Sequence, residues 1–305
     1  MSDLRIASLV PSATEIVAAL GQAESIVARS HECDWPPEVA KAPACTRARI
    51  DASKPSGAIH EEVGKLLAAA LSLYDLDTEV LRVARPSHIV TQDQCDVCAV
   101  GLPEVEAAAA EFLEAPVQIV SLAPMRLGDV WDDIARVGDV LGVDARPVRE
   151  RLRERVTAIA ERAKALPPRR VLTVEWSDPP MTAGNWVPEL VALAGGIDTL
   201  GADGGHSPRI TVEAVAAADP DIIVLMPCGY DLPRTAADGR ALLANPAWGG
   251  LRAARAGAVY ATDGNAYFNR PGPRLVESLE ILAEIIHPAH FAFGHEGTGW
   301  NRLTM

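Results

Sequence analysis

Two parts of the chain repeat one order of apolar and polar positions. Each begins with a short apolar run rich in β-branched residues, continues through a loop of Pro and small polar residues into helical spacing, and ends at a Gly. The first copy spans residues 5–21 and the second spans residues 169–196. This order predicts a strand, a loop and a helix, with the loop at the carboxyl end of a parallel strand, where open α/β sheets bind ligands. We therefore expect an α/β protein of two parallel-sheet lobes with a ligand cleft between them.

The remainder of each lobe alternates between apolar runs and helical spacing. In the first lobe this predicts strands and helices in the order strand 5–10, helix 13–20, strand 25–30, helices 60–73 and 78–84, strand 87–92, helix 103–114 and strand 117–122. The second lobe is expected to contain strand 170–176, helices 186–194 and 211–217, strand 221–227, helix 237–244, strand 258–264 and helix 271–286. The tail from His287 shows little periodicity, so we expect it to be loosely held.

A long stretch from Leu127 to Leu166 separates the two lobes. Apolar residues recur along it at helical spacing. Pro147 either bends this helix or starts a second one, and the pair Pro167-Pro168 ends it. Because a helix is stiff, we expect a spacer and not a flexible linker. The predicted domains are an N-terminal lobe at 1–125, a helical connector at 126–167 and a C-terminal lobe at 168–305.

Composition and charge exclude several classes of protein. A length of 305 residues favours two domains, and an apolar fraction of 49% lets each lobe bury a core. The net charge of −13 argues against a nucleic-acid partner. No apolar run reaches the roughly 18 residues of a membrane span. The N-terminal residues show no secretory signal, so we expect a cytoplasmic location, or a periplasmic one for a chain that has lost its leader.

Five cysteines, Cys33, Cys45, Cys95, Cys98 and Cys228, are too few for a disulfide framework in a chain of this length. Cys95 and Cys98 form a CxxC pair directly after an expected strand, a spacing that suits a thiolate pair on one metal ion or a strained disulfide. With Cys33 and Cys228 they are the candidate ligands of a zinc ion or an iron–sulfur cluster. A cytoplasmic metalloprotein or enzyme built on this centre is one hypothesis. The alternative is that the CxxC thiols fill half-buried space at a turn.

The loop after the second expected strand, His31 to Trp35, is rich in groups that bind metals or flat rings. A neutral imidazole at His31 can donate to haem iron or corrinoid cobalt, and Trp35 can stack on a macrocycle. The competing interpretation places His31 on the surface and Trp35 over the core. Pro11 and Ser12, after the first strand, and Gln92, at the end of the strand at 87–92, are expected at the same edge and complete the candidates of the first lobe.

The second lobe offers aromatic and polar candidates in its own loops. Trp176 and Trp186 flank the first of these loops, and aromatic rings there bury area at little entropic cost. The alternative for Trp186 is a place in the core. Later loops contribute further candidate ligand-binding residues, namely His206, Tyr230, Tyr267 and Arg270. Arg270 can pair with a carboxylate or cap the next helix.

Motifs of common enzyme classes are absent from the sequence. It contains no GxGxxG or GxxxxGK[ST] phosphate loop and no GxSxG nucleophile elbow. The Ser, His and Asp residues are scattered and form no recognisable triad. The sequence therefore favours a binding protein over an enzyme.

Several ordered motifs resemble one family. SLVPSATEIVAALG at 8–21 and CDWPPE at 33–38 resemble the opening of class III periplasmic binding proteins, the receptors of ABC importers for vitamin B12, siderophores and haem. Gly195-Gly196, ADPDIIVL at 218–225 and RPGPRLVESLEILAEIIHP at 270–288 are similar to the same family. The nearest branch is the cobalamin-binding one. The resemblance implies two α/β lobes joined by one long helix, a shallow, rather rigid cleft, and a large planar or metal-bearing ligand, with cobalamin or another corrinoid expected first.

Two departures from the family bear on transport. The sequence lacks a secretory signal, and residues 53–100 form a longer segment than the family has at this place. The receptors dock on permease arginines through a Glu on each lobe, for which Glu62 and Glu213 are the candidates here. We therefore expect a small-molecule ligand, whereas a permease partner is doubtful.

Overall fold

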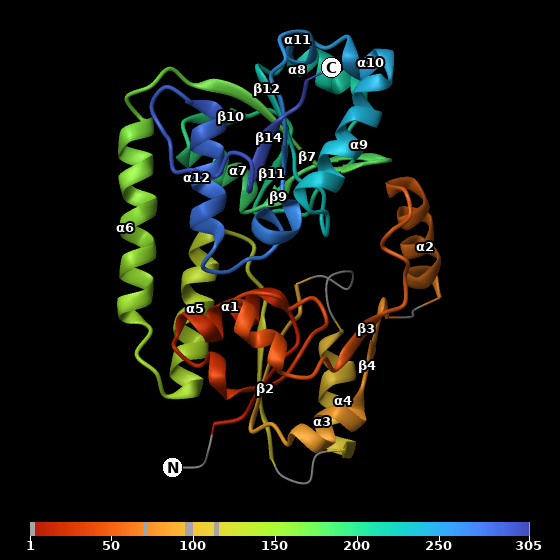
Figure 1. Ribbon diagram of the computed structural model, residues 1–305, viewed down its shortest axis with the longest axis vertical. Helices are drawn as coiled ribbons and strands as arrows, with labels where there is room; N and C mark the ends of the chain where they lie inside the picture. Colours follow the sequence, from red (N-terminus) through yellow and green to blue (C-terminus); the bar gives the residue numbers. More distant parts are fainter. Residues whose placement is uncertain (1–3, 70–71, 95–99, 113–115, 305) are drawn as a thin grey trace. The chain divides into compact units, whose positions relative to one another are not determined.

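The computed structural model divides into two compact units, each built around a β-sheet (Figure 1). Unit 1 comprises Met1–Pro124 and Gly128–Arg151, and unit 2 comprises Met125–Leu127 and Leu152–Met305. The structure describes residues 4–69, 72–94, 100–112 and 116–304. The expected α/β architecture of two lobes, each with a mainly parallel sheet, is confirmed.

Unit 1 contains a four-stranded parallel sheet in the order β2-β1-β5-β6. Its strands are β1 (Ile6–Ser8), β2 (Ile26–Arg29), β5 (His88–Gln92) and β6 (Gln118–Leu122). The helices of this unit include α1 (Pro11–Ala19), α2 (Ser56–Ala68), α3 (Thr78–Ala84), α4 (Leu102–Phe112) and α5 (Leu127–Leu141), with short 3₁₀ turns at Ala23–Ser25 and Pro37–Lys41. Ile6 and Ile89 are fully buried, as expected for strands covered on both faces. Because all four strands run the same way, the loops that follow them gather at one edge.

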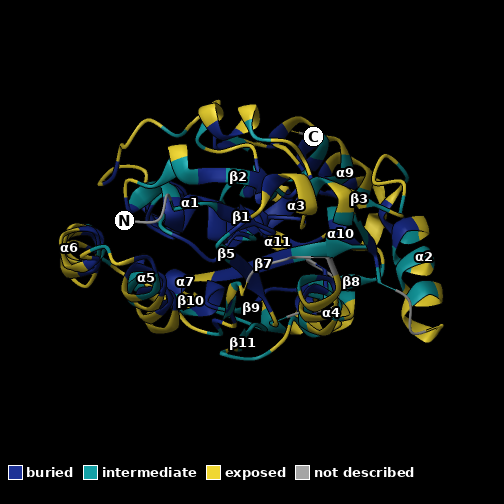
Figure 2. Cartoon of the chain, turned by 90° about the horizontal axis from the view of Figure 1, so that it is seen from below, coloured by how far each residue is buried: buried dark blue, intermediate teal, exposed yellow. Residues whose placement is uncertain are grey.

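A small antiparallel pair in unit 1 was not predicted from the sequence. Strand β3 (Thr46–Ala48) pairs with β4 (Tyr74–Leu76), and α2 lies between them along the chain. Each strand has only three residues, which is too short to show an alternation of apolar and polar positions. Most residues of α2 are exposed or of intermediate burial, and its ribbon in Figure 2 is largely yellow and teal.

The stretch expected as a helical connector holds two helices, α5 and α6 (Arg146–Ala163), and the long helix α6 is the one along which the chain passes from unit 1 to unit 2. Helix α5 ends at Leu141, and Gly142 follows with a φ of +69°, a backbone conformation that favours Gly. Helix α6 then begins, with Pro147 in its first turn, where a missing N–H costs nothing. Of the two alternatives for Pro147, the start of a second helix is the one observed.

Helix α5 buries one carboxyl group, that of Asp133. Its side chain is 8% exposed, and Oδ1 accepts a hydrogen bond of 2.5 Å from Arg136 Nη2. Within the described residues Oδ2 has no hydrogen-bond partner. Burial raises the pKa of Asp133 to about 6, despite the opposing charge of Arg136.

We expect Asp133→Asn to stabilise the protein at pH 8 by about 2 kcal/mol and to change little at pH 4. Between about pH 4 and pH 6 the folded chain keeps a proton that the unfolded chain has lost, so ionisation of Asp133 lowers stability as the pH rises through that window. Urea unfolding of both proteins at the two pH values measures the difference. Asp132→Asn, next in sequence but 79% exposed, is the control and should be nearly neutral. An equal gain at both pH values would contradict the prediction.

Unit 2 contains a six-stranded sheet with the order β10-β7-β12-β13-β14, and β8 pairs with β7 outside this path. The strands are β7 (Arg169–Ser177), β8 (Pro180–Thr182), β10 (Gly196–Asp198), β12 (Ile222–Leu225), β13 (Val259–Thr262) and β14 (Trp300–Arg302), and a separate pair joins β9 (Gly184–Asn185) and β11 (Ala202–Asp203). The helices are α7 (Val187–Leu193), α8 (Val212–Ala218), α9 (Leu232–Ala244), α10 (Pro246–Gly249), α11 (Arg252–Arg255) and α12 (Leu275–Ile286), with a π-helical turn at Gly264–Phe268. Strands β10, β7, β12 and β13 are mutually parallel, so the loops after them also share one edge.

The expectation of a loosely held C-terminal tail is wrong. Strand β14 adds to the sheet antiparallel to β13, and its Trp300 is 7% exposed. Phe291, earlier in the tail, is 3% exposed. The tail lacks periodicity because its contacts are made by irregular backbone that donates hydrogen bonds to the buried carboxylate of Glu284.

Candidate functional site

His31 lies two residues after the carboxyl end of β2 in unit 1. Its Nδ1 lies 2.7 Å from Thr46 Oγ1, which also accepts the backbone N–H of His31 at 3.0 Å. Thr46 donates its own proton to Ser30 Oγ at 3.0 Å, so Nδ1 must carry the proton of the imidazole. The other nitrogen, Nε2, then presents a lone pair, and no hydrogen bond to it occurs within the described residues.

The surroundings of His31 keep its ring neutral. Burial lowers its pKa, and the neighbouring charge of Arg29 lowers it further. The ring packs on Tyr74, with centroids 5.7 Å apart. A neutral, oriented imidazole with an unprotonated Nε2 is the arrangement that ligates metals in proteins.

His31 also lines a pocket in unit 1 of about 570 Å³. The walls come from the β3–β4 pair and the start of α3, and comprise Ala44, Thr46, Arg47, Asp75, Leu76, Asp77, Thr78 and Glu79. The carboxylates are already engaged, since Asp75 bonds Arg49 at 2.6 Å and Asp77 caps α3. The pocket therefore offers one available metal-donor nitrogen and not a cage of ligands.

The other candidate ligand-binding residues of unit 1 differ in how far they are buried. Pro11 and Ser12 were expected in a loop. Helix α1 begins two residues earlier than predicted, so they form its first turn, and both are buried. Gln92 ends β5 and is 4% exposed, and its Nε2, like Ser12 Oγ, has no hydrogen-bond partner in the described chain. Trp35 is 46% exposed, so it does not cover the core.

The cysteines divide into buried and exposed thiols. Cys33 is 1% exposed and lies 2.9 Å from Thr14 Oγ1. Cys45 is fully buried, and burial, with the nearby Cys33, raises the pKa of its thiol to about 12. Cys228 is exposed. Cys95 and Cys98 lie outside the described residues, and in the part that is described no group of three or more His, Cys, Asp or Glu side chains could hold a metal ion.

We expect Cys228 to react with iodoacetamide in the native protein, while Cys33 and Cys45 stay unmodified. Reaction requires a thiolate that the reagent can reach, and burial denies both conditions to Cys45. Peptide mapping by mass spectrometry after brief labelling at pH 8 distinguishes the sites, and labelling in denaturant serves as the control. Native labelling of Cys45 as fast as that of Cys228 would contradict the structure.

In unit 2, an aromatic pair with a cation lies where β7 and β12 end. Trp176, near the end of β7, packs on Tyr230 with ring centroids 5.4 Å apart and a tilt of 58°. Arg234, in the first turn of α9, places its guanidinium carbon 3.7 Å from the centroid of the Tyr230 ring. Tyr230 is 3% exposed, whereas Trp176 is only partly buried, so Trp176 is the member that offers a face to a ligand.

The loop after β11 meets the end of β7 through a serine. Ser207 Oγ donates to Glu175 Oε2 at 2.7 Å and accepts the Gly184 N–H at 3.1 Å. A Cβ on Gly184 would overlap the backbone of Gly205, so a larger residue would separate the two loops. His206, next to this serine, is exposed.

Three remaining candidates lie in or near the π-helical turn and α7. Trp186 belongs to the core: it is 5% exposed and donates its indole N–H to the Phe268 carbonyl at 2.9 Å. Tyr267 is partly buried, and the guanidinium carbon of Arg274 lies 4.7 Å from its ring centroid. Arg270 is 4% exposed.

Sequence reasoning missed Thr46 and Arg234. Thr46 lies 15 residues from His31 on a strand too short to predict, so nothing in the pattern indicated its contact with the imidazole. Arg234 follows Asp231, a residue typical of helix N-termini, and a helix predicted from Leu232 would have placed it one turn from Tyr230.

Comparison with known proteins identifies the family. Residues 6–266 match the family described as periplasmic binding protein, so the chain belongs to that family. No curated protein matches the chain. Within the described residues, no helix is long and apolar enough to cross a membrane. The family description gives no support to the cytoplasmic location expected from the N-terminal residues.

Solved structures share the fold at low sequence identity. A periplasmic haem-binding protein from Pseudomonas aeruginosa is 21% identical over 99% of this chain and 98% of its own, with a TM-score of 0.73. The haem-binding protein RhuT from Roseiflexus is 22% identical over 95% and 100%, with a TM-score of 0.69. The vitamin B12-binding protein BtuF of Vibrio cholerae is 20% identical over 93% and 97%, with a TM-score of 0.64.

Proposed function

We propose that this protein binds a metal-bearing tetrapyrrole, haem or a corrinoid, through the loops at the carboxyl edges of its two sheets. The proposal is carried by His31, whose Nδ1–H is held by Thr46 so that a neutral Nε2 is available to the metal. The binding of haem or vitamin B12 by proteins with this fold supports the same class of ligand.

Unit 2 has its own groups that suit such a ligand. The partly buried Trp176, backed by Tyr230, offers an apolar face for a macrocycle. Arg234 adds a positive charge beside it, which suits carboxylate side chains on the ligand rim. A cobalamin-like corrinoid, the ligand that the sequence resemblance favours, is the narrower form of this proposal.

The cysteine-held metal centre stays a prediction, because two of its four ligands lie outside the described residues. The candidate contacts with a permease, Glu62 and Glu213, likewise stay a prediction. Glu62 forms an ion pair with Lys54 at 2.7 Å, and Glu213 lies in the first turn of α8.

We expect His31→Ala to weaken hemin binding by roughly 10- to 100-fold and to leave the binding of metal-free protoporphyrin IX unchanged. Only the iron porphyrin can form a bond to Nε2, so the two probes separate metal ligation from ring stacking. Absorption titrations of both compounds, with the Soret band as the signal, measure the two affinities. His60→Ala, a change of the same kind elsewhere in unit 1, is the control. Equal losses for both porphyrins, or none for either, would refute the role of His31.

A further inference from the structure

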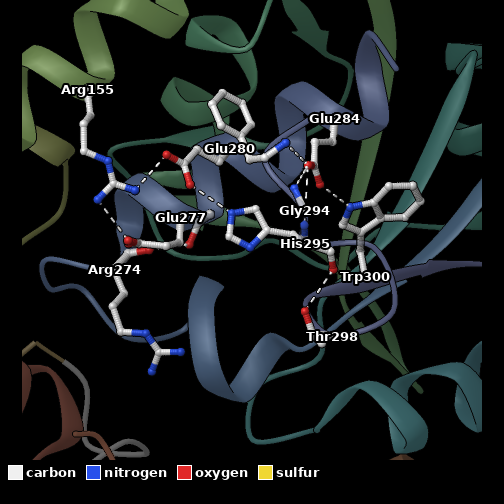
Figure 3. A network of polar contacts seen from close by, with 11 residues as sticks. Arg155, Arg274, Glu277, Glu280, Glu284, Gly294, His295, Thr298 and Trp300 are labelled. Atoms are coloured by element: carbon white, nitrogen blue, oxygen red, sulfur yellow. Dashed lines mark hydrogen bonds and ion pairs between the residues drawn. The ribbon is translucent and has the colours of Figure 1, made fainter. Parts of the chain in front are cut away.

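The C-terminal segment, residues 287–303, is anchored to α12 by one buried carboxylate. Glu284 is 4% exposed, and its Oε2 accepts the indole N–H of Trp300 at 2.7 Å (Figure 3). Its Oε1 accepts the backbone N–H groups of Phe293, of Gly294 at 2.7 Å and of His295 at 3.4 Å. The backbone around His295 is therefore fixed relative to the helix.

The ring of His295 is fixed by a second carboxylate. Its Nε2 lies 2.9 Å from Glu280 Oε2, and Glu280 Oε1 accepts a 2.7 Å hydrogen bond from Arg155 on α6. Arg155 also bonds Glu277 at 3.0 Å, as Figure 3 shows. Burial raises the pKa of Glu280, but the hydrogen bonds from His295 and Arg155 outweigh burial and hold that pKa below its usual value. The carboxylate is thus ionised and accepts a hydrogen bond from the Nε2–H group of His295.

The imidazole ring of His295 contacts the ring of Tyr267, one of the candidate ligand-binding residues. The ring centroids of His295 and Tyr267 are 6.1 Å apart at 70°, an edge-to-face contact. Arg274, one residue before α12, lies over the Tyr267 ring at 4.7 Å. Tyr267 follows β13, so it lies at the carboxyl edge of the unit 2 sheet.

We infer that His295 is a positioning residue for Tyr267, fixing the orientation of its ring for ligand binding at this edge. The effect of His295 on ligand affinity rests on the proposed function, whereas its effect on the orientation of the Tyr267 ring does not. The contacts run from Arg155 through Glu280 and His295 to Tyr267, so the C-terminal segment, which the sequence had not marked as functional, contributes to the site.

The ring itself can be observed without a ligand. The chain has four tyrosines, so 3-fluorotyrosine labelling gives few ¹⁹F resonances, and Tyr267→Phe assigns the one of interest. We expect His295→Ala to shift and broaden the Tyr267 resonance and to leave the other three unchanged. His290→Ala, an exposed histidine of the same segment, should change none of them. An unchanged Tyr267 resonance in His295→Ala would overturn the inference.

The consequence for binding is tested by a double-mutant cycle with hemin as the probe. We expect His295→Ala to weaken hemin binding about three- to tenfold in the wild-type background and less than about twofold in Tyr267→Ala. A merely structural role would give the same loss in both backgrounds and would overturn the inference. If the Tyr267 resonance shifts but wild-type protein binds no tetrapyrrole, the positioning role stands and the proposed function fails.

Discussion

Replacing Glu284 with Ala should cost about 3–5 kcal/mol of stability, the largest effect of any single substitution that we predict. The carboxylate accepts hydrogen bonds from three backbone amides and from Trp300 Nε1, and it is almost completely buried. Its removal leaves these donors without a partner, and a buried donor without a partner costs the full penalty of its desolvation. Urea denaturation at pH 7, followed by circular dichroism, measures the loss.

A matched control for this prediction lies in the same segment. Glu296 is exposed, so Glu296→Ala removes a carboxylate of equal charge and should change stability by less than about 0.5 kcal/mol. A second measurement, hydrogen exchange, shows which segments lose stability in Glu284→Ala. Hydrogen exchange should accelerate first in β14 and in the segment around Gly294, which the carboxylate ties to α12. Equal stabilities of the two variants would show that Glu284 does not anchor the segment.

Replacing Trp176 with Ala should weaken tetrapyrrole binding by about 30-fold, which corresponds to roughly 2 kcal/mol. Aromatic residues of this kind dominate binding energies because they bury a large apolar area with only two side-chain torsions. Trp176 is partly exposed and packs on the buried ring of Tyr230, so its loss removes the aromatic ring of the pair that a ligand can contact. Fluorescence or absorption titration with hemin gives the affinity.

Trp176→Phe provides the matched comparison, because it keeps an aromatic face and loses only part of the area. We expect a loss of about threefold for Phe, and similar thermal stability for both variants, since the ring of Trp176 is not enclosed in the core. Affinities that are equal in Ala, Phe and wild-type proteins would exclude Trp176 from the ligand site.

The parts of the fold that the sequence predicted are those with strong periodicity. The apolar run at the start of the predicted C-terminal lobe became β7, and the segment at 78–84 became α3 with the expected bounds, because burial on both faces or on one stripe leaves a clear pattern. Strands β3 and β14 were missed because Thr46–Ala48 and Trp300–Arg302 lie in no apolar run, unlike the equally short β1. The anchoring of the tail was also missed, because a carboxylate that binds backbone N–H groups imposes no pattern on the residues it holds.

The sequence predicted which loops form the candidate site, but it did not predict which side chains of those loops are exposed or what they contact. Topology alone placed His31 and Trp176 at the carboxyl ends of strands. The distinction between Trp176, which is partly exposed, and Trp186, which donates to Phe268 inside the core, depends on tertiary contacts. The tautomer of His31 depends on Thr46, a partner 15 residues away that no local signal identifies.

The most direct test of the central claim is a calorimetric titration of the purified protein with hemin and, separately, with hydroxocobalamin. The proposed function predicts saturable binding of at least one of them at a single site, with a dissociation constant of about 1 μM or lower and a shift of the visible absorption band. Saturable binding that His31→Ala or Trp176→Ala weakens would assign the substituted residue to the ligand site. The absence of heat and of any band shift with either compound would contradict the account.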